Sequence, residues 1–206
     1  MYTGRRQRCA RCQRPATHCL CAHIPSLPNR TRVLVLQHSD EARHPLNTAR
    51  LAVLGLQHAD LWVGEHFEQL EEIVAAAVQP LLLFPASKEN AGSEQTNSPD
   101  VPAVALDSSL LIVPDGTWRK ARQIVRANPV LQELPRLSLP AGQPSEYRIR
   151  KATEPAALAT IEAIVRALET LEPQQDFQPL LRPFRVMVEQ QIRAMGEDVY
   201  QRNHGV

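Results

Sequence analysis

Five short apolar runs, separated by polar stretches, predict the strands of this chain. They span residues 32–38, 59–64, 81–85, 110–113 and 136–139, and the first reads RVLVLQH. The run at 110–113 is expected to stop where Pro114, Asp115 and Gly116 follow it. Nearly continuous apolar runs of this kind are typical of buried strands.

Amphipathic stretches with helical spacing lie between these runs and after them. They span residues 44–57, 67–78, 118–127, 156–171 and 184–195. Asn47 is a candidate N-cap for the first, and Pro80 is expected to end the second. In the fourth, Leu158, Ile161 and Leu168 fall on one face. The alternation predicts a mostly parallel α/β sheet with helices on both faces.

Length and composition fit one domain with a small appendage. The chain has 206 residues, of which 43% are hydrophobic and 22% charged. Aromatic residues make up only 4%, which argues against a broad stacking platform for single-stranded nucleic acid. There is no apolar run of membrane-spanning length and no secretory signal at the start. We therefore expect a soluble cytoplasmic protein with no membrane partner.

Charge is distributed unevenly along the chain. The net charge is +7 over residues 1–50, −8 over 51–110, +5 over 111–151 and −3 over 152–206. Two basic blocks around an acidic one indicate a polarised surface of the kind that meets phosphate backbones. The alternative is a set of solvated faces that neutralise one another in the fold.

All four cysteines lie in one short segment, CARCQRPATHCLC. They are Cys9, Cys12, Cys19 and Cys21. This spacing predicts a structural Zn²⁺ site, because four thiolates close a tetrahedron and a segment this short has no core of its own. Two disulfides or four unrelated thiols are the alternatives, and the absence of a secretory signal argues against disulfides. We predict a zinc-binding basic segment over residues 1–30 and an α/β domain over 31–206.

Three loops are expected to meet at the carboxyl edge of the sheet, where open parallel sheets bind ligands. They begin FPAS, PDGTW and LPAGQPSEYRIRK, after the runs at 81–85, 110–113 and 136–139. In the second, Asp115 and Gly116 could form an ordinary turn, with Thr117 as N-cap and Trp118 as a core anchor. The usual fingerprints GxGxxG and Walker loop are missing.

The sequence DGTW (115–118) resembles the signature of the DTW-domain family. The order of other segments agrees: the cysteine-rich start, HPLNTARL, LLLFP, YRIR and LATIEA. The resemblance runs from Cys9 to about Ala163. The chain departs from the pattern at Ala159, where the family usually has serine, and alanine has no hydroxyl to make a contact at that position.

This resemblance implies a tRNA-uridine aminocarboxypropyltransferase. Such enzymes transfer the 3-amino-3-carboxypropyl group of S-adenosylmethionine to N3 of a uridine, in bacterial members within the tRNA variable loop, and release methylthioadenosine. Kinship with trefoil-knotted (SPOUT-like) RNA methyltransferases implies a knotted C-terminal half and a cofactor-binding half at about residues 80–172. The alternatives are an S-adenosylmethionine-dependent RNA methyltransferase and a non-catalytic, zinc-dependent RNA-binding module.

The resemblance and the loop positions together give the candidate site. Asp115 is the candidate base for the uridine N3 proton, with His44 as a weaker alternative, and Thr117 and Trp118 complete the catalytic set. The candidate residues for binding S-adenosylmethionine are Phe84, Pro85, Ser87, Asp115, Gly116, Leu139, Pro140, Tyr147, Arg150, Thr160 and Glu162. Arg150 would pair with the cofactor carboxylate and Glu162 with its amine. Ordinary turns, a solvated loop and a first-turn carboxylate are the structural alternatives.

Basic side chains on the N-terminal segment and on the helix after DGTW suggest a tRNA track, with no role for DNA. The candidates are Arg5, Arg6, Arg8, Arg11, Arg14, Arg43, Arg119, Lys120, Arg122, Arg126 and Arg148.

Overall fold

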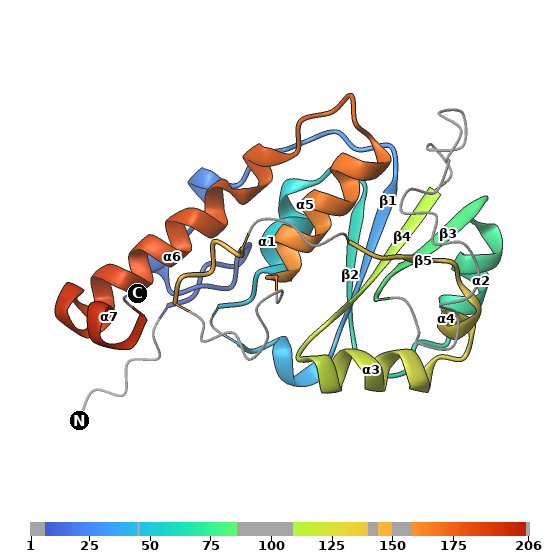
Figure 1. Cartoon of the computed structure of the whole chain (residues 1–206), viewed down its shortest axis with the longest axis horizontal. Helices are drawn as coiled ribbons and strands as arrows, with labels where there is room; N and C mark the ends of the chain where they lie inside the picture. Colours follow the sequence, from blue (N-terminus) through green and yellow to red (C-terminus); the bar gives the residue numbers. More distant parts are fainter. Residues whose placement is uncertain (1–6, 45, 86–108, 140–143, 150–157, 205–206) are drawn as a thin grey trace.

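A five-stranded parallel sheet forms the centre of the described chain (Figure 1). The computed structural model describes residues 7–44, 46–85, 109–139, 144–149 and 158–204. The strands are β1 (Arg32–Gln37), β2 (Ala59–Val63), β3 (Gln79–Leu83), β4 (Ser109–Asp115) and β5 (Arg136–Leu137), in the order β2-β1-β4-β3-β5. Because every pairing is parallel, all their carboxyl ends meet at one edge. The predicted parallel sheet is confirmed.

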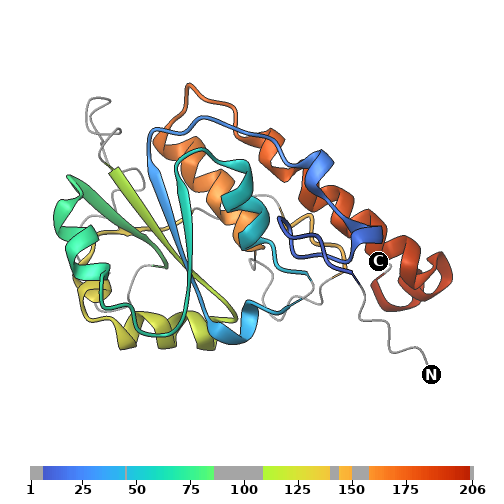
Figure 2. The same ribbon diagram turned by 180° about the vertical axis from the view of Figure 1, so that it is seen from behind.

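Helices cover both faces of this sheet, as predicted (Figures 1 and 2). On one face lie α1 (Ala49–Gly55), α5 (Thr160–Leu171) and α6 (Arg182–Met195), with α7 (Glu197–His204) after them. On the other lie α2 (Leu70–Ala76), α3 (Trp118–Ala127) and α4 (Val130–Glu133). The sequence did not predict the short helices α4 and α7.

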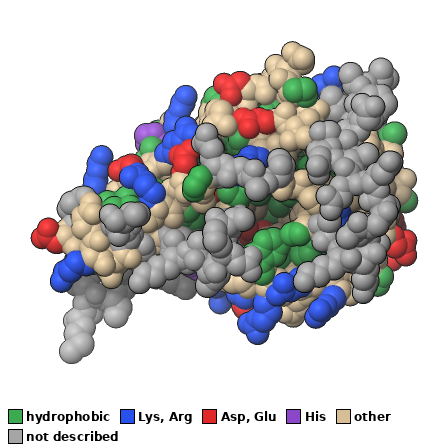
Figure 3. Space-filling model, viewed as in Figure 1, with side chains coloured by type: hydrophobic (Ala, Val, Ile, Leu, Met, Phe, Trp, Pro, Cys, Tyr) green, Lys and Arg blue, Asp and Glu red, His purple; other side chains and the backbone are tan. Residues whose placement is uncertain are grey.

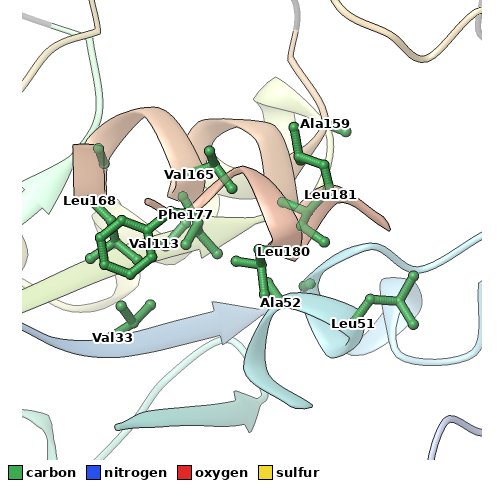
Figure 4. Close-up of a cluster of buried hydrophobic side chains, with 14 of the residues drawn as sticks. Val33, Leu51, Ala52, Val113, Ala159, Val165, Leu168, Phe177, Leu180 and Leu181 are labelled. Carbon is green, nitrogen blue, oxygen red and sulfur yellow. The ribbon is translucent and has the colours of Figure 1, made fainter. Parts of the chain in front are cut away.

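The alternation of side chains along the strands divides the core in two. Val33 and Val35 of β1 pack with α1, α5 and α6, whereas Leu34 and Leu36 pack with α2, α3 and α4. Phe177, from the connection between α5 and α6, is fully buried in the first cluster (Figure 4). Burying a side chain of this size contributes about 1.5–3 kcal/mol. The first cluster therefore fixes α5 against the sheet.

Strand β4 continues through Pro114 and Asp115, so the expected break at Pro114 is wrong. Asp115 carbonyl accepts a hydrogen bond from His38 N at 3.0 Å, which points residue 115 toward β1 and residue 114 toward β3. The pairing of β3 with β4 ends at Leu82 and Ile112. Pro114 has no N–H to donate, but β3 is no longer paired with β4 at this position. The strand can therefore include the proline without losing a hydrogen bond.

Other boundaries shift by a few residues. Helix α2 ends at Ala76, and Pro80 lies inside β3 rather than directly terminating the helix. The strand expected at 136–139 ends at Leu137. Helix α5 begins at Thr160, and residues 150–157 lie outside the described part of the chain.

The N-terminal segment, from Gln7 to Arg30, packs beside α1 and α6 (Figure 2). It contains two single-turn 3₁₀ helices, Ala16–His18 and Cys21–His23. Leu20 lies between them and is fully buried in the same core cluster as α5 and α6. Arg11 Nη2 donates to the carbonyl of Leu54 at 3.4 Å. The segment is thus docked on the α/β core.

None of the helices in the described ranges combines the length and apolar character that crossing a membrane requires. The trefoil knot implied by the family resemblance stays a prediction.

Candidate active site and metal centre

Asp115 lies at the carboxyl edge of the sheet, where β4 turns into α3. Its register partner is Gln37, the last residue of β1, and its side chain is only 8% exposed. The turn depends on Gly116, whose φ is +152°. A Cβ at this position would lie 2.9 Å from Cβ of Lys120. A glycine is therefore needed to bring the chain from the buried carboxylate into the helix.

Side-chain donors reach both oxygens of the Asp115 carboxylate. Gln37 Nε2 donates to Oδ2 at 2.6 Å, and the Thr160 hydroxyl donates to Oδ1. Such hydrogen bonds are stronger than those between neutral groups, and they compensate for the burial of the carboxylate. The network joins β1, β4 and the first turn of α5.

Asp115 was predicted at this edge and Thr160 as a cofactor-binding residue, whereas Gln37 was missed. Gln37 is fully buried at the end of a strand that is otherwise apolar after Arg32. A lone amide ending an apolar run was the available signal, because a buried amide needs partners.

Thr117 and Trp118 open α3 as expected, with different surroundings. The Thr117 hydroxyl accepts from Lys120 N at 3.4 Å, which makes Thr117 the N-cap. Trp118 is 39% exposed, and its ring meets Phe84 edge-on with centroids 5.9 Å apart. Arg136 lies over the other ring, 5.6 Å from the centroid of Phe84. Trp118 is thus an exposed ring at the rim rather than a core anchor.

A second polar cluster, which includes His38, Glu41 and Lys120, borders Gly116. The buried His38 accepts from Asp40 N at its Nδ1 and lies 3.2 Å from Glu65 through its Nε2. Lys120 Nζ lies 2.9 Å from Glu41 and 3.3 Å from Asp40. Hydrogen bonding to Glu41 raises the pKa of Lys120. His44, the weaker candidate base, is exposed on the following loop.

Glu162 holds the loop at 144–149 in place. Its carboxylate accepts from Ser145 Oγ at 2.5 Å, from Glu146 N at 2.7 Å and from Ala159 N at 2.7 Å. This buried carboxylate therefore positions backbone, whereas the family resemblance suggested contact with a cofactor amine.

The same loop is attached to α6. Arg185 forms two hydrogen bonds with Glu146, at 2.7 and 2.8 Å, and lowers the pKa of that carboxyl. Tyr147 packs edge-on against Phe184, with centroids 5.3 Å apart. Arg148 is paired with Glu189. The YRIR segment is thus fixed between α5 and α6 as far as residue 149.

The remaining cofactor candidates lie at the same edge or outside the described residues. Pro85 is exposed after β3, and its carbonyl accepts from Arg136 at 2.9 Å. Leu139 is half-buried against the first core cluster. Ser87, Pro140 and Arg150 lie outside the described part of the chain.

The basic residues predicted to bind tRNA differ in their exposure and in their partners. Arg119, Arg122 and Arg126 are exposed along α3. Lys and Arg side chains gather on the lower rim of Figure 3, where Figure 1 shows α3. Arg14 is half-buried and donates to the carbonyl of His18 at 3.1 Å, and burial lowers its pKa. Arg8, Arg11 and Arg43 are exposed, whereas Arg5 and Arg6 lie outside the described residues.

The four cysteines form one compact cluster. The Sγ atoms of Cys9 and Cys21 are 3.5 Å apart, those of Cys12 and Cys19 are 3.8 Å apart, and all four lie within 4.8 Å of one another. A tetrahedral site with Zn–S bonds of about 2.3 Å has sulfur atoms about 3.8 Å apart. The cluster therefore has the donor set and the size of a closed zinc site.

The thiols do not have equal acidity. Backbone N–H groups of Cys12 and Arg11 lower the pKa of Cys9 to about 6. Burial, together with the neighbouring thiols, raises the pKa of Cys21 to about 12. Four adjacent thiolates repel one another without a cation, so the arrangement favours metal binding coupled to proton release.

Comparison with known proteins identifies the family. A profile of the DTW domain matches residues 6–192. The tRNA-uridine aminocarboxypropyltransferase 2 of Drosophila melanogaster is 30% identical over 200 residues, which cover 92% of this chain and 76% of the fly protein. The mouse protein of the same name is 31% identical over 205 residues, covering 93% of this chain and 66% of its own length.

A plant relative agrees. The tRNA-uridine aminocarboxypropyltransferase A of Arabidopsis thaliana is 30% identical over 206 residues, which cover 82% of this chain and 74% of the plant protein. No solved structure matches the chain.

Proposed function

The chain belongs to the DTW domain family, and from this premise we propose that it is a tRNA-uridine aminocarboxypropyltransferase. The observation that carries the proposal is the similarity to three proteins of that name along most of the chain. The Asp115 site supports it, because a buried, hydrogen-bonded carboxylate stands at the edge where parallel sheets bind ligands. A tRNA substrate agrees with the cytoplasmic location expected from the sequence.

We propose S-adenosylmethionine as donor and uridine N3 as acceptor. The N3–H bond breaks and its proton passes to Asp115, while N3 bonds to the methylene carbon of the aminocarboxypropyl arm. The bond from this carbon to sulfur breaks, and methylthioadenosine leaves. Because the sulfonium has three electrophilic carbons, the protein must select one by the pose it imposes.

The rim around Asp115 has features suited to this donor. Phe84 and Trp118 offer aromatic surface for adenine or a base, next to the exposed residue Pro85. Thr160 and Gly116 border the carboxylate, and Tyr147 and Leu139 close the side toward α6. The residues proposed to bind S-adenosylmethionine also include Arg150, Ser87 and Pro140, which are assigned from the sequence alone.

We propose that residues 1–30 form a structural zinc module docked on an α/β domain of residues 31–206. The sulfur spacing fits Zn²⁺, and four thiolates leave no open position, so the metal stabilises the segment rather than taking part in the reaction. Burial of Leu20 in the main core ties the module to α6.

We propose that tRNA binds along α3 and the N-terminal module. Arg119, Arg122 and Arg126 form an exposed row that begins beside Asp115. Lys120 and Arg148 already have carboxylate partners, so each would have to exchange its partner to contact phosphate.

Nucleoside mass spectrometry tests the function directly. Unmodified bacterial tRNA is incubated with the protein and S-adenosylmethionine, digested, and analysed beside a reaction with Asp115→Asn. A uridine that gains the aminocarboxypropyl group, with methylthioadenosine as co-product, is the expected result. A methyl gain with S-adenosylhomocysteine would assign a methyltransferase instead. Absence of any modification across total tRNA, with cofactor bound, would refute the tRNA activity.

A further inference from the structure

A directed chain of hydrogen bonds leads from the start of α1 to Asp115. Asn47 Oδ1 accepts from Arg50 N at 3.0 Å, and Asn47 Nδ2 donates to Gln37 Oε1 at 3.1 Å. Gln37 Nε2 then donates to Asp115 Oδ2 at 2.6 Å. Every link therefore runs in the same direction, from a backbone N–H of α1 to the carboxylate.

Backbone groups determine the orientation of both amides. Arg50 N can only donate, so it must face the oxygen of Asn47. Asn47 Nδ2 also donates to the carbonyl of Glu41 at 3.2 Å, which can only accept. With Asn47 fixed, a flipped Gln37 would set donor against donor at Asn47 and acceptor against acceptor at Asp115. Gln37 is fully buried, so water cannot relieve those contacts.

The two oxygens of Asp115 consequently differ. Oδ2 has a donor that cannot turn away, because the amide of Gln37 is fixed at both ends. Oδ1 is bonded to the Thr160 hydroxyl, whose hydrogen rotates about a single bond and which sits on a half-buried residue. Oδ1 can therefore exchange its bond with Thr160 for a substrate without breaking the chain.

We propose that Asn47 and Gln37 are positioning residues that hold the Asp115 carboxylate in one plane, and that Oδ1 is the oxygen that accepts the substrate proton. The inference rests on the proposed function. It assigns two residues to the reaction that touch neither the donor nor the uridine. Loss of such orientation costs about 10- to 100-fold in activity when similar supporting residues are removed.

Asn47→Asp is the sharpest test. The change preserves shape and the acceptor for Arg50 N, but the new carboxylate has no hydrogen to donate to Gln37 or Glu41. The matched control is Asn29→Asp at the opposite end of β1. There Nδ2 donates to the carbonyls of Thr31 and His58, at 2.8 and 2.9 Å, and Oδ1 accepts from His58 N at 3.0 Å. Both variants lose two amide donors, and Asn29 is the more deeply buried residue, so the loss of thermal stability in the control should be at least as large.

The expected result is a split between kcat and KM. Asn47→Asp should lower kcat about 10- to 100-fold with KM values for both substrates within about twofold of wild type, whereas Asn29→Asp should retain kcat. Gln37→Glu, which removes the donor to Oδ2 directly, should lower kcat at least as much. Equal kcat in the Asn47 and Asn29 variants would overturn the positioning role while leaving the proposed function intact.

Hydrogen exchange of the Gln37 side chain does not depend on turnover, so it separates the positioning role from the proposed function. The side-chain NH₂ protons of Gln37 should exchange slowly in wild type, and this protection should fall in Asn47→Asp but not in Asn29→Asp. Unchanged protection would refute the chain even if the enzyme acts on another RNA. An inactive wild-type protein with the expected protection would refute the proposed function and, with it, the catalytic reading of the chain.

Discussion

The Asp115 site and the cysteine cluster are both small groups of polar side chains, but they are held together by different forces. Asp115 lies on β4 and its partners come from β1 and α5, and the hydrophobic core fixes each of these elements. In the cluster, the four sulfur atoms lie on one short segment of turns and 3₁₀ helices. Their own contacts are weak, and their charges repel when ionised.

The difference concerns preorganisation. Folding of the α/β core is sufficient to assemble the Asp115 network, whereas the proposed zinc site would need a cation to hold its thiolates together. Loss of metal should therefore disturb the N-terminal segment first and leave the carboxylate network in place. Variants at Asp115 and Cys12 test this contrast.

The largest effect is expected for Asp115→Asn. The amide keeps the volume of the side chain but is a poor proton acceptor, so kcat should fall about 10²- to 10⁴-fold, as measured by product mass spectrometry. The matched control is Asp60→Asn, which alters a half-exposed pair with Arg32 at 2.7 Å and should not change the rate. A folded Asp115→Asn protein with full activity would remove the proposed base.

The second-largest effect is expected for loss of the proposed metal. Cys12→Ala should abolish binding of about one zinc ion per chain, increase proteolysis of the N-terminal segment and weaken tRNA binding about tenfold or more, while donor binding stays within about twofold. Zinc content by elemental analysis and limited proteolysis measure this.

His23→Ala is the control for that experiment, because His23 lies in the second 3₁₀ turn beside the cluster but outside the four-cysteine set. It should retain zinc. Zinc loss in this variant would show that the histidine replaces a cysteine, and unchanged tRNA binding without zinc would separate the segment from RNA recognition.

The third-largest effect is expected for the exposed row of arginines on α3. Replacing Arg119, Arg122 and Arg126 by glutamine should reduce the slope of log Kd against log salt concentration by about 2 to 3, because each phosphate contact releases about 0.7 to 0.9 counterions. The control is a double change of Arg193 and Arg202, which are exposed on α6 and α7. Equal slopes for the two sets would refute the α3 track.

The smallest effect is a gain in stability. Ala159 is the N-cap of α5, and Glu162 already accepts from its N–H at 2.7 Å. Ala159→Ser would add the missing hydroxyl of a capping box and should raise the free energy of unfolding by about 1 kcal/mol. Ala163→Ser, inside the same helix, should lower it by a few tenths of a kcal/mol. Denaturant unfolding would detect both, and a loss at residue 159 would show that the core has no room for the hydroxyl.

Local pattern was sufficient for much of this molecule. The apolar runs located all five described strands, since buried parallel strands leave a nearly continuous apolar signature. Thr117 was predicted as N-cap because its cap bond lies within one turn of helix. The cysteine cluster was equally local, because all its members lie within thirteen residues.

Contacts between segments that are far apart in the sequence were harder to predict from the sequence. The partners of Glu162 were not predicted: the fold places Ser145 and Glu146 against its carboxylate, and its contact with a cofactor amine stays a prediction. Arg148 and Lys120 appeared to be free cations, yet each meets an acid from another element. Pairings of this kind depend on which loops the core brings together, and residue type does not reveal them.

Residue spacing alone determined the parallel sheet, the helices on both of its faces and the grouping of four thiols, because each of these depends on neighbours in the chain. Only the tertiary structure decided that Gln37, Asn47 and Thr160 converge on Asp115. Those side chains come from segments up to 123 residues apart, and they meet because buried polar groups must find partners within a core that apolar packing has already shaped.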